Sequence, residues 1–271
     1  MRTILILFVL LTFGCSEKSN NSKKISGKTN SYQVFDDREY SFKEMLSNWS
    51  TKFAEKIDSN YTATINFKLS DLDKEMYQVE FKDKRFKLYH GQNDSSNMTF
   101  ESTLKHYNKI YKGDMTAMTS MGQATSSDPI PLIPKLEKPI TDNPLNDFLF
   151  FSQRFFNLSN YDKVKLGLKH SRLIHGGNAI PIFYQKSNEF GVRSAWYQIN
   201  KGEQVNEIGD TNPYPQYFII TGGNGFAKIG IDTISIKSNE AYYVAPKNDH
   251  IFWNKNDEPL TIIFIAYGKG A

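Results

Sequence analysis

Residues 216–245 read QYFIITGGNGFAKIGIDTISIKSNEAYYVA, and this stretch decides the fold of the C-terminal part of the chain. It holds four short runs rich in Ile, Val, Phe, Tyr and Thr, which are residue types that favour strands. GGNG and KSNE separate some of these runs, and Gly- and Asn-rich tetrapeptides of this kind form turns. Short strands at such close spacing predict an all-β sandwich or barrel.

The same pattern continues on both sides of this stretch. SAWYQI at 194–199 and LTIIFIAY at 260–267 are further strand-like runs, so we expect an all-β domain over residues 161–271. The spacing of the runs resembles that of a cupin. Gly202 and Gly222 stand at the separation of the two glycines in the first cupin motif. The resemblance implies a small jelly-roll barrel.

The cupin resemblance also implies a metal site, because the motifs of that family carry His and Glu ligands. Here the ligand positions of the first motif hold Ile208, Asp210 and Pro215, while the second motif keeps His250 and has Asn254 four residues later. A transition metal needs several imidazole or carboxylate ligands at one point. One imidazole does not meet that need, so we expect neither a metal nor another cofactor.

The preferred prediction for His250 is therefore a polar member of a pocket in the barrel. The alternatives, in order of preference, are a purely structural residue and a metal ligand. A shifted alignment would add Asn212 and Gln216 as neighbours, but amides bind transition metals weakly. The further candidates for binding a small ligand are Asp210, Tyr217 and Tyr243, with Trp253 or Phe252 at the rim.

Residues 40–138 have a different pattern. SFKEMLSNWSTKFAEKI at 41–57 repeats its apolar residues every three or four positions, which predicts an amphipathic helix with a capping box. YTATINFKL at 61–69 alternates as a half-buried strand does, and three shorter runs follow it. An aromatic helix that ends at Gly113 and a short methionine-rich helix complete a predicted α+β domain.

This order of elements resembles the sterol carrier protein (SCP-2-like) domain over residues 41–136, with Gly91 in a turn, MTF at 98–100 and KGDM at 112–115. The resemblance implies an apolar tunnel for fatty acyl or sterol-like ligands and no catalytic residues. Because methionine is soft and adaptable, Met115, Met118 and Met121 are candidate ligand-binding residues; the alternative is that they fill the core. Residues 139–160 are predicted to form a linker helix.

The N-terminus reads MRTILILFVLLTFGC, with a basic start, an apolar run and a small residue directly before Cys15. Residues 1–14 are predicted to be a signal peptide, and the position of Cys15 resembles a bacterial lipobox. We expect Cys15 to be the lipidated first residue of the mature protein and residues 15–39 to be a tether. The alternative is an ordinary signal peptide with a chance cysteine. Lipidation would anchor the chain to the cell envelope, by our expectation to the outer membrane.

The charge of the chain argues against one class of partner. Its 33 basic and 29 acidic residues are interspersed, so we do not expect it to bind nucleic acid. The first hypothesis for function is a non-catalytic envelope lipoprotein that binds a small apolar or amphipathic ligand. The second is a metal-dependent cupin isomerase or oxygenase, whose N-terminal domain delivers substrate or forms a homodimer.

Overall fold

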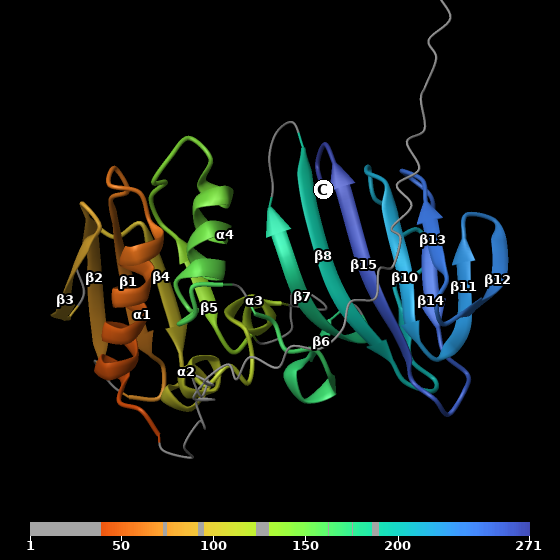
Figure 1. The fold of residues 1–271 in the computed structure, drawn as a ribbon, viewed down its shortest axis with the longest axis horizontal. Coiled ribbons are helices and arrows are strands. Elements are labelled where there is room, and N and C mark those ends of the chain that lie inside the picture. The colour runs from red at the N-terminus through yellow and green to blue at the C-terminus, as the bar shows by residue number, and fades with distance from the viewer. Residues whose placement is uncertain are drawn as a thin grey trace, which may run out of the picture. The chain divides into compact units, whose positions relative to one another are not determined.

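The computed structural model describes residues 39–72, 75–91, 95–122, 130–161, 163–174, 176–185 and 190–271. The predicted signal peptide and Cys15 lie outside these ranges. Within them the chain forms a five-stranded sheet with helices, followed along the sequence by a six-stranded and a four-stranded sheet (Figure 1). No helix in these ranges is both long and apolar enough to cross a membrane.

The five-stranded sheet has the strand order β3-β2-β1-β4-β5, in which β1 runs parallel to β4 and the other neighbours are antiparallel. The predicted first helix is present as α1, and the Oγ of its N-cap Ser41 accepts a hydrogen bond from the Glu44 amide. The elements of this region are α1 (Phe42–Lys56), β1 (Ala63–Leu69), β2 (Met76–Lys82), β3 (Arg85–His90), β4 (Met98–Ser102), α2 (Leu104–Tyr111), α3 (Ala117–Met121), β5 (Ile133–Leu136) and α4 (Pro144–Arg154).

Aromatic side chains from α1 and from the α4 segment pack into one core. Trp49 and Phe53 of α1 and Phe151 and Phe155 of the α4 segment are fully buried. The ring centroids of Phe53 and Phe151 are 5.1 Å apart, and those of Trp49 and Phe155 are 5.9 Å apart. The helix predicted within residues 139–160 is present as α4, and its phenylalanines belong to the core of the sheet that precedes it.

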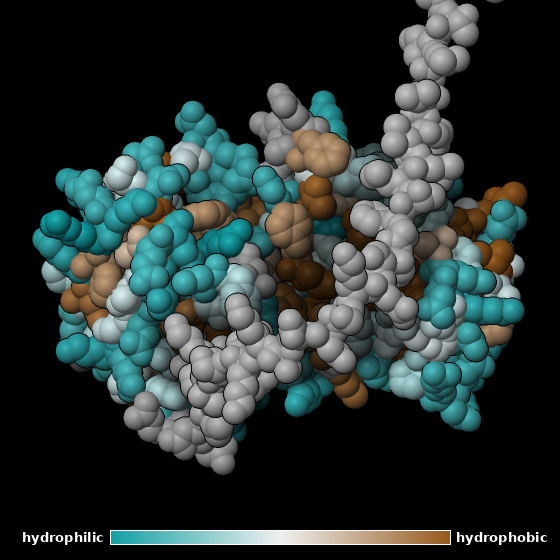
Figure 2. Space-filling model, viewed as in Figure 1, coloured by the Kyte–Doolittle hydropathy of each residue, from teal (hydrophilic) through white to brown (hydrophobic). Residues whose placement is uncertain are grey.

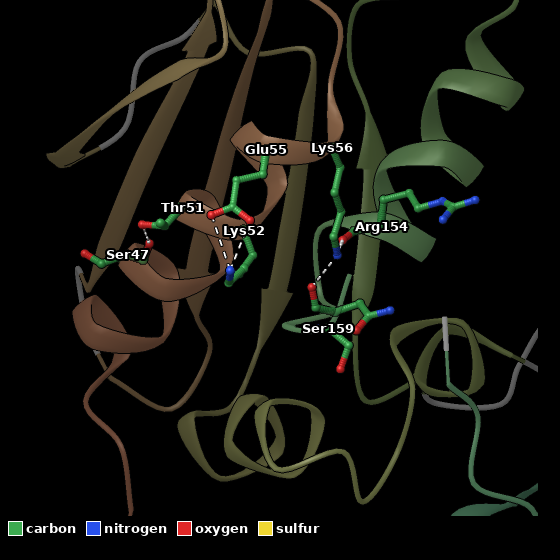
Figure 3. Close-up of polar contacts among 8 residues, drawn as sticks. Ser47, Thr51, Lys52, Glu55, Lys56, Arg154 and Ser159 are labelled. Atoms are coloured by element: carbon green, nitrogen blue, oxygen red, sulfur yellow. Dashed lines mark hydrogen bonds and ion pairs between the residues drawn. The ribbon is translucent and has the colours of Figure 1, made fainter. Parts of the chain in front are cut away.

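Lys56 links the C-terminal ends of α1 and α4 by hydrogen bonds. The Lys56 ammonium, at the end of α1, donates hydrogen bonds to the backbone carbonyls of Arg154 and Asn157 (Figure 3). The last carbonyls of a helix lack partners within the helix and carry partial negative charge. Lys56 thus satisfies polar groups at the C-terminal end of α4.

The two later sheets form a jelly roll. The six-stranded sheet has the order β13-β10-β15-β8-β7-β6 and the four-stranded sheet has the order β12-β11-β14-β9, with antiparallel neighbours throughout. From β8 onward, successive strands alternate between the sheets, except that β11 and β12 form a hairpin within the four-stranded sheet, and this is the interleaved order of a jelly roll. The strands are β6 (Arg172–Ile174), β7 (Gly177–Gln185), β8 (Gly191–Ile199), β9 (Gln204–Val205), β10 (Gln216–Gly222), β11 (Asn224–Ile229), β12 (Asp232–Lys237), β13 (Ala241–Val244), β14 (His250–Trp253) and β15 (Leu260–Gly268).

This arrangement confirms the prediction of a jelly-roll β fold for the C-terminal part of the chain. The inward side chains of both sheets, such as Phe218 of β10 and Phe252 of β14, are buried in one apolar cluster. The predicted GGNG turn joins β10 to β11. There Gly223 has a φ of +70°, and a Cβ atom added to it would lie 2.2 Å from the carbonyl oxygen of Pro259. Only glycine fits such a position without a shift of the backbone.

Hydrophilic residues cover much of the face of the molecule that Figure 2 shows, and apolar residues appear between them. This surface agrees with the interspersed charges of the sequence. Ion pairs such as Lys201–Asp257, at 2.6 Å, and Lys68–Glu101, at 3.1 Å, join residues distant in sequence.

Candidate functional site

Three adjacent strands of the six-stranded sheet place a row of side chains on its inner face. In the strand register, Arg193 of β8 lies beside Ala266 of β15, which lies beside Gln216 of β10. Because side chains alternate along a strand, this row faces the same way as Phe218 and Phe264, which pack toward the other sheet. Gln216 and Ala266 are buried and Arg193 is half-buried. Two strongly polar groups therefore lie at the inner side of the jelly roll.

Asn212, in the loop before β10, connects these polar groups. Its Oδ1 accepts a hydrogen bond of 2.7 Å from the Tyr214 hydroxyl and lies 3.5 Å from Nη2 of Arg193. Its Nδ2 lies 3.4 Å from Oε1 of Gln216 and 3.5 Å from Nε2 of His250. Distances of 3.4–3.5 Å are at the limit for a hydrogen bond. The Asn212 network is thus held firmly by Tyr214 and loosely at its other three contacts.

Aromatic rings surround the guanidinium of Arg193. Its central carbon lies 4.6 Å from the centroid of Tyr214 and 5.9 Å from the centroids of Tyr184 and Phe264. Burial lowers the pKa of Arg193, while Tyr184 and Tyr197 oppose that shift. A guanidinium stays protonated at neutral pH even so. The cluster therefore contains a fixed positive charge against an aromatic wall.

Two donor groups in this cluster have no hydrogen-bond partner among the described residues. They are Nε of Arg193 and Nε2 of Gln216, and both atoms are buried. The great majority of buried polar side-chain atoms in proteins have a partner, and a buried donor without one is costly. Ordered water or a polar ligand atom would satisfy such donors.

His250, at the start of β14, is 2% exposed, and its ring centroid lies 5.5 Å from that of Phe218. Its Nδ1 lies 3.2 Å from the carbonyl oxygen of Asn248. Since a carbonyl only accepts, Nδ1 carries the proton, and Nε2 is left as an acceptor toward Asn212. Burial lowers the pKa of His250, so the ring is neutral at pH 7. The structure thus places His250 at the edge of the Asn212 network, as a polar group inside the jelly roll.

The carboxylate of Asp210 makes its hydrogen bond within its own loop and not to the Asn212 network. Asp210 is exposed, and its carboxylate accepts a hydrogen bond of 2.7 Å from the Glu207 amide. It acts on His250 only through its charge, which opposes the lowering of the pKa of His250.

Tyr217 and Tyr243 are not brought to His250. Their side chains are 40% and 48% exposed, and their ring centroids are 5.2 Å apart on the outer face of the six-stranded sheet. The expectation that they share a pocket with His250 is therefore corrected. The reason is strand phase, because β10 turns Phe218 toward the core and so must turn Tyr217 outward.

The residues predicted for a rim are also placed elsewhere. Phe252 is fully buried, with its ring centroid 4.3 Å from that of Phe218. Trp253 is half-buried on the outer face of the four-stranded sheet and stacks on Phe226. There it lines, with Ile251 and Lys228, a groove of ≈ 470 Å³ that includes no residue of the Asn212 network.

The three methionines predicted for an acyl tunnel lie outside the jelly roll. Met118 and Met121 are on the short helix α3 and Met115 directly precedes it, and all three are half-buried. Met121 packs against the aromatic core of the first sheet. Cys15, the predicted lipidation site, lies outside the described residues.

The side chains around His250 do not fit the metal site that the cupin resemblance implies. In the described part of the chain, no three His, Cys, Asp or Glu side chains gather at one point. The neighbour of His250 in this network is the amide of Asn212, and Arg193 lies on the other side of that amide. A positive charge so close opposes the binding of a cation. The donors that have no partner are N–H groups, which bind anions or acceptors.

Two residues of this network, Arg193 and Tyr214, are not predicted from the sequence. The sequence does carry one signal for Arg193. This charged residue lies on the same face of its strand as the apolar Tyr197 and Ile199. Tyr214 carries no such signal, since it stands in the loop TNPYP.

No family model matches the chain, and no curated protein matches it. Among solved structures it is similar to a Cupin 2 conserved barrel domain protein from Salinispora arenicola, at 14% identity over 40% of this chain and 89% of that one, with a TM-score of 0.34. It is also similar to the Cnp3 cupin domain of Schizosaccharomyces pombe, at 14% identity over 39% and 74% of the two chains, with a TM-score of 0.33. A cupin superfamily protein from Desulfitobacterium hafniense gives 15% identity over 32% and 73%, with a TM-score of 0.28. These values are too low to transfer the role of any residue.

Proposed function

We propose that the jelly-roll part of this chain is a non-catalytic, cupin-like barrel that binds a small molecule. One observation carries the proposal: a buried polar network around Asn212 contains two donors without a partner among the described residues. Buried donors of this kind are costly to a fold unless something else satisfies them. A bound molecule with acceptor atoms would do so.

The attachment and the setting of the chain are part of the proposal. Lipidation of Cys15 would hold the chain on the outer membrane or elsewhere on the cell envelope, where the barrel would bind an amphipathic molecule. The support for this is the N-terminal sequence, with its apolar run and its small residue before the cysteine.

Ligand screening by thermal denaturation tests the binding function. A panel of neutral, anionic and cationic small molecules is added to the purified protein, and the variant Asn212→Ala is compared with Asn224→Ala. Asn224 is exposed on β11, so it serves as the matched control. We expect at least one compound to raise the melting temperature of the parent and of Asn224→Ala, and to raise that of Asn212→Ala much less.

Two results would contradict the proposal. The first is that no compound in the panel stabilises the parent. The second is elemental analysis that finds about one iron, manganese, zinc or nickel per chain, which would favour the metal-dependent enzyme.

A further inference from the structure

The charge of Arg193 is not balanced by any acidic side chain in the described part of the chain. Its contacts among the described residues are the aromatic rings, the Oδ1 of Asn212 and a side-chain hydrogen bond with Tyr184, and the side chains that act on its pKa are those of Tyr184 and Tyr197. Burial of a guanidinium removes part of its hydration, and an anion nearby compensates for that loss. Among the described residues, the site therefore holds no counter-ion for Arg193.

The Nε–H edge of the guanidinium carries a donor that the described residues leave unsatisfied. The Tyr214 ring makes a cation–π contact with the group, at 4.6 Å from its centroid to the central carbon. Nε has no partner among the described residues, Nη2 lies 3.5 Å from Oδ1 of Asn212, and the Tyr184 side chain also hydrogen-bonds the guanidinium. Nε and an Nη group together form the donor pair that binds the two oxygens of a carboxylate.

A further donor lies in the same row of the sheet. Nε2 of Gln216 has no partner, and Gln216 is separated from Arg193 only by Ala266 on the intervening strand. Alanine has the smallest side chain that such a row can carry apart from glycine. A ligand that reaches Arg193 therefore lies within range of a second N–H group.

The surroundings of Arg193 also indicate what the rest of the ligand is like. Phe264 lies 5.9 Å from Arg193 and 5.3 Å from Phe218, so an apolar surface begins directly beside the charge. His250 is neutral and adds no competing charge. Such a site suits an organic anion with an apolar or aromatic body.

We infer that the jelly roll binds a small organic carboxylate, whose oxygens accept hydrogen bonds from Nε and Nη2 of Arg193 while its body packs beside Phe264. The inference rests on the proposed binding function and names the chemical class of its ligand. It replaces the metal of a cupin site by a salt bridge between the chain and its ligand.

Isothermal titration calorimetry with matched probes tests this inference. Benzoate and octanoate are the carboxylates, benzamide and octanamide are their neutral counterparts, and acetate and inorganic phosphate test the need for a body and for a carboxylate. We expect a carboxylate to bind the parent at least about tenfold more tightly than its amide. Equal affinities for acid and amide would overturn the inference and leave the binding function intact.

Variants of the cluster make the test specific. We expect Arg193→Met to weaken carboxylate binding at least about tenfold and Arg193→Lys to have a smaller effect, since lysine keeps the charge and loses the paired donors. Gln216→Glu supplies a carboxylate within the chain and should also abolish binding of the probe. Because this variant keeps Arg193, it remains informative if Arg193→Met fails to fold.

Two control variants complete the design. Arg85→Met removes an exposed arginine from β3 and should leave the affinity unchanged. Glu189→Gln removes the acidic residue nearest in sequence to β8, which lies outside the described residues, and should also leave it unchanged. A gain in affinity for Glu189→Gln would show that Glu189 is the counter-ion of Arg193 and would overturn the inference. If none of the probes binds the parent but another compound of the screening panel does, the inference about carboxylates is wrong and the proposed binding function stands.

Discussion

At the scale of single residues, His106 shows how neighbouring contacts fix the state of an imidazole. Its Nε2 lies 2.9 Å from Oγ of Ser120, and that hydroxyl donates its own hydrogen to the carbonyl oxygen of Thr116 at 2.8 Å. Nε2 of His106 must therefore carry a proton and donate it to Ser120. Burial, followed by the charges of Lys109 and Arg172, lowers the pKa of His106 to about 4.

This shift predicts an acid-sensitive contribution to stability. The ordinary pKa of 6.5 applies to the unfolded chain, so between pH 6.5 and about 4 the unfolded state binds more protons at this site than the folded state. The free energy of unfolding should fall as the pH is lowered through this range, and this group should add no further loss below it. Urea titrations of the parent and of His106→Gln at several pH values measure this effect.

The matched control is His90→Gln. The His90 side chain is 64% exposed, so its replacement removes an imidazole without disturbing the packed interior. If His106→Gln retains the full slope of stability against pH, burial does not control the protonation of His106.

At this scale, candidate residues come from positions that carry their own signal in the sequence. His250 was predicted as a polar group in the jelly roll, and Asn212 and Gln216 came from the shifted alignment that was considered for metal binding. Tyr217 was assigned to the wrong face because alternation shows which residues share a face and does not show which face is buried. The role of Arg193 depends on the absence of a nearby carboxylate in the described part of the fold, which a sequence does not display.

At the scale of elements, the α4 helix shows that two neighbouring residues of the same type can differ in burial. Phe150 and Phe151 are neighbours of the same type, yet Phe150 is 40% exposed and Phe151 is fully buried. The helix turns by about 100° per residue, so adjacent residues point in different directions. Phe151 packs within the core against Phe53 and Phe100, while Phe150 contacts only its edge, with its ring centroid 6.0 Å from those of Phe53 and Tyr61.

The pair Phe151→Ala and Phe150→Ala tests this assignment. The first should lower the free energy of unfolding by about 3–5 kcal/mol, because it leaves a cavity in a packed aromatic core. The second should cost about 1 kcal/mol or less. Chemical denaturation of both variants measures the difference, and equal losses would show that α4 does not pack as described.

Predicted and observed elements differ where the pattern is short. The runs at 194–199, 216–221 and 260–267 are present as β8, β10 and β15, because each is long and rich in β-branched and aromatic residues. The four residues of β14 were considered as part of the second cupin motif and as candidates for a rim. The α4 helix was expected to be a linker, since its composition does not reveal that its partners lie in the preceding sheet.

At the scale of the whole molecule, the membrane anchor is a prediction from the N-terminal sequence. Replacing Cys15 by Ser should prevent lipidation, and without acyl chains the protein should leave the membrane fraction. Two or more acyl chains anchor a protein firmly, while one gives marginal binding. Membrane fractionation together with labelling by a fatty acid tests this. Unchanged fractionation of Cys15→Ser, with no label on the parent, would refute the lipoprotein proposal.

A role for the N-terminal α+β elements in binding acyl chains likewise stays a prediction. If Met118 lines an acyl site, the parent should take up a fluorescent fatty acid saturably, and Met118→Lys should abolish the uptake because an unpaired ammonium in an apolar site is costly. Lys105→Met is a suitable control, since Lys105 is exposed on α2. Saturable uptake that persists in Met118→Lys would exclude these methionines as its site.

The central claim is that the jelly roll binds an anion at Arg193 where a metal-dependent cupin would hold a cation near His250. A crystal structure of the purified protein grown with benzoate, with elemental analysis of the same preparation, tests this most directly. We predict carboxylate oxygens within about 3 Å of Nε and Nη2 of Arg193, and no stoichiometric transition metal. A metal bonded to Nε2 of His250 at about 2.1 Å, with Arg193 free of any anion, would contradict the account.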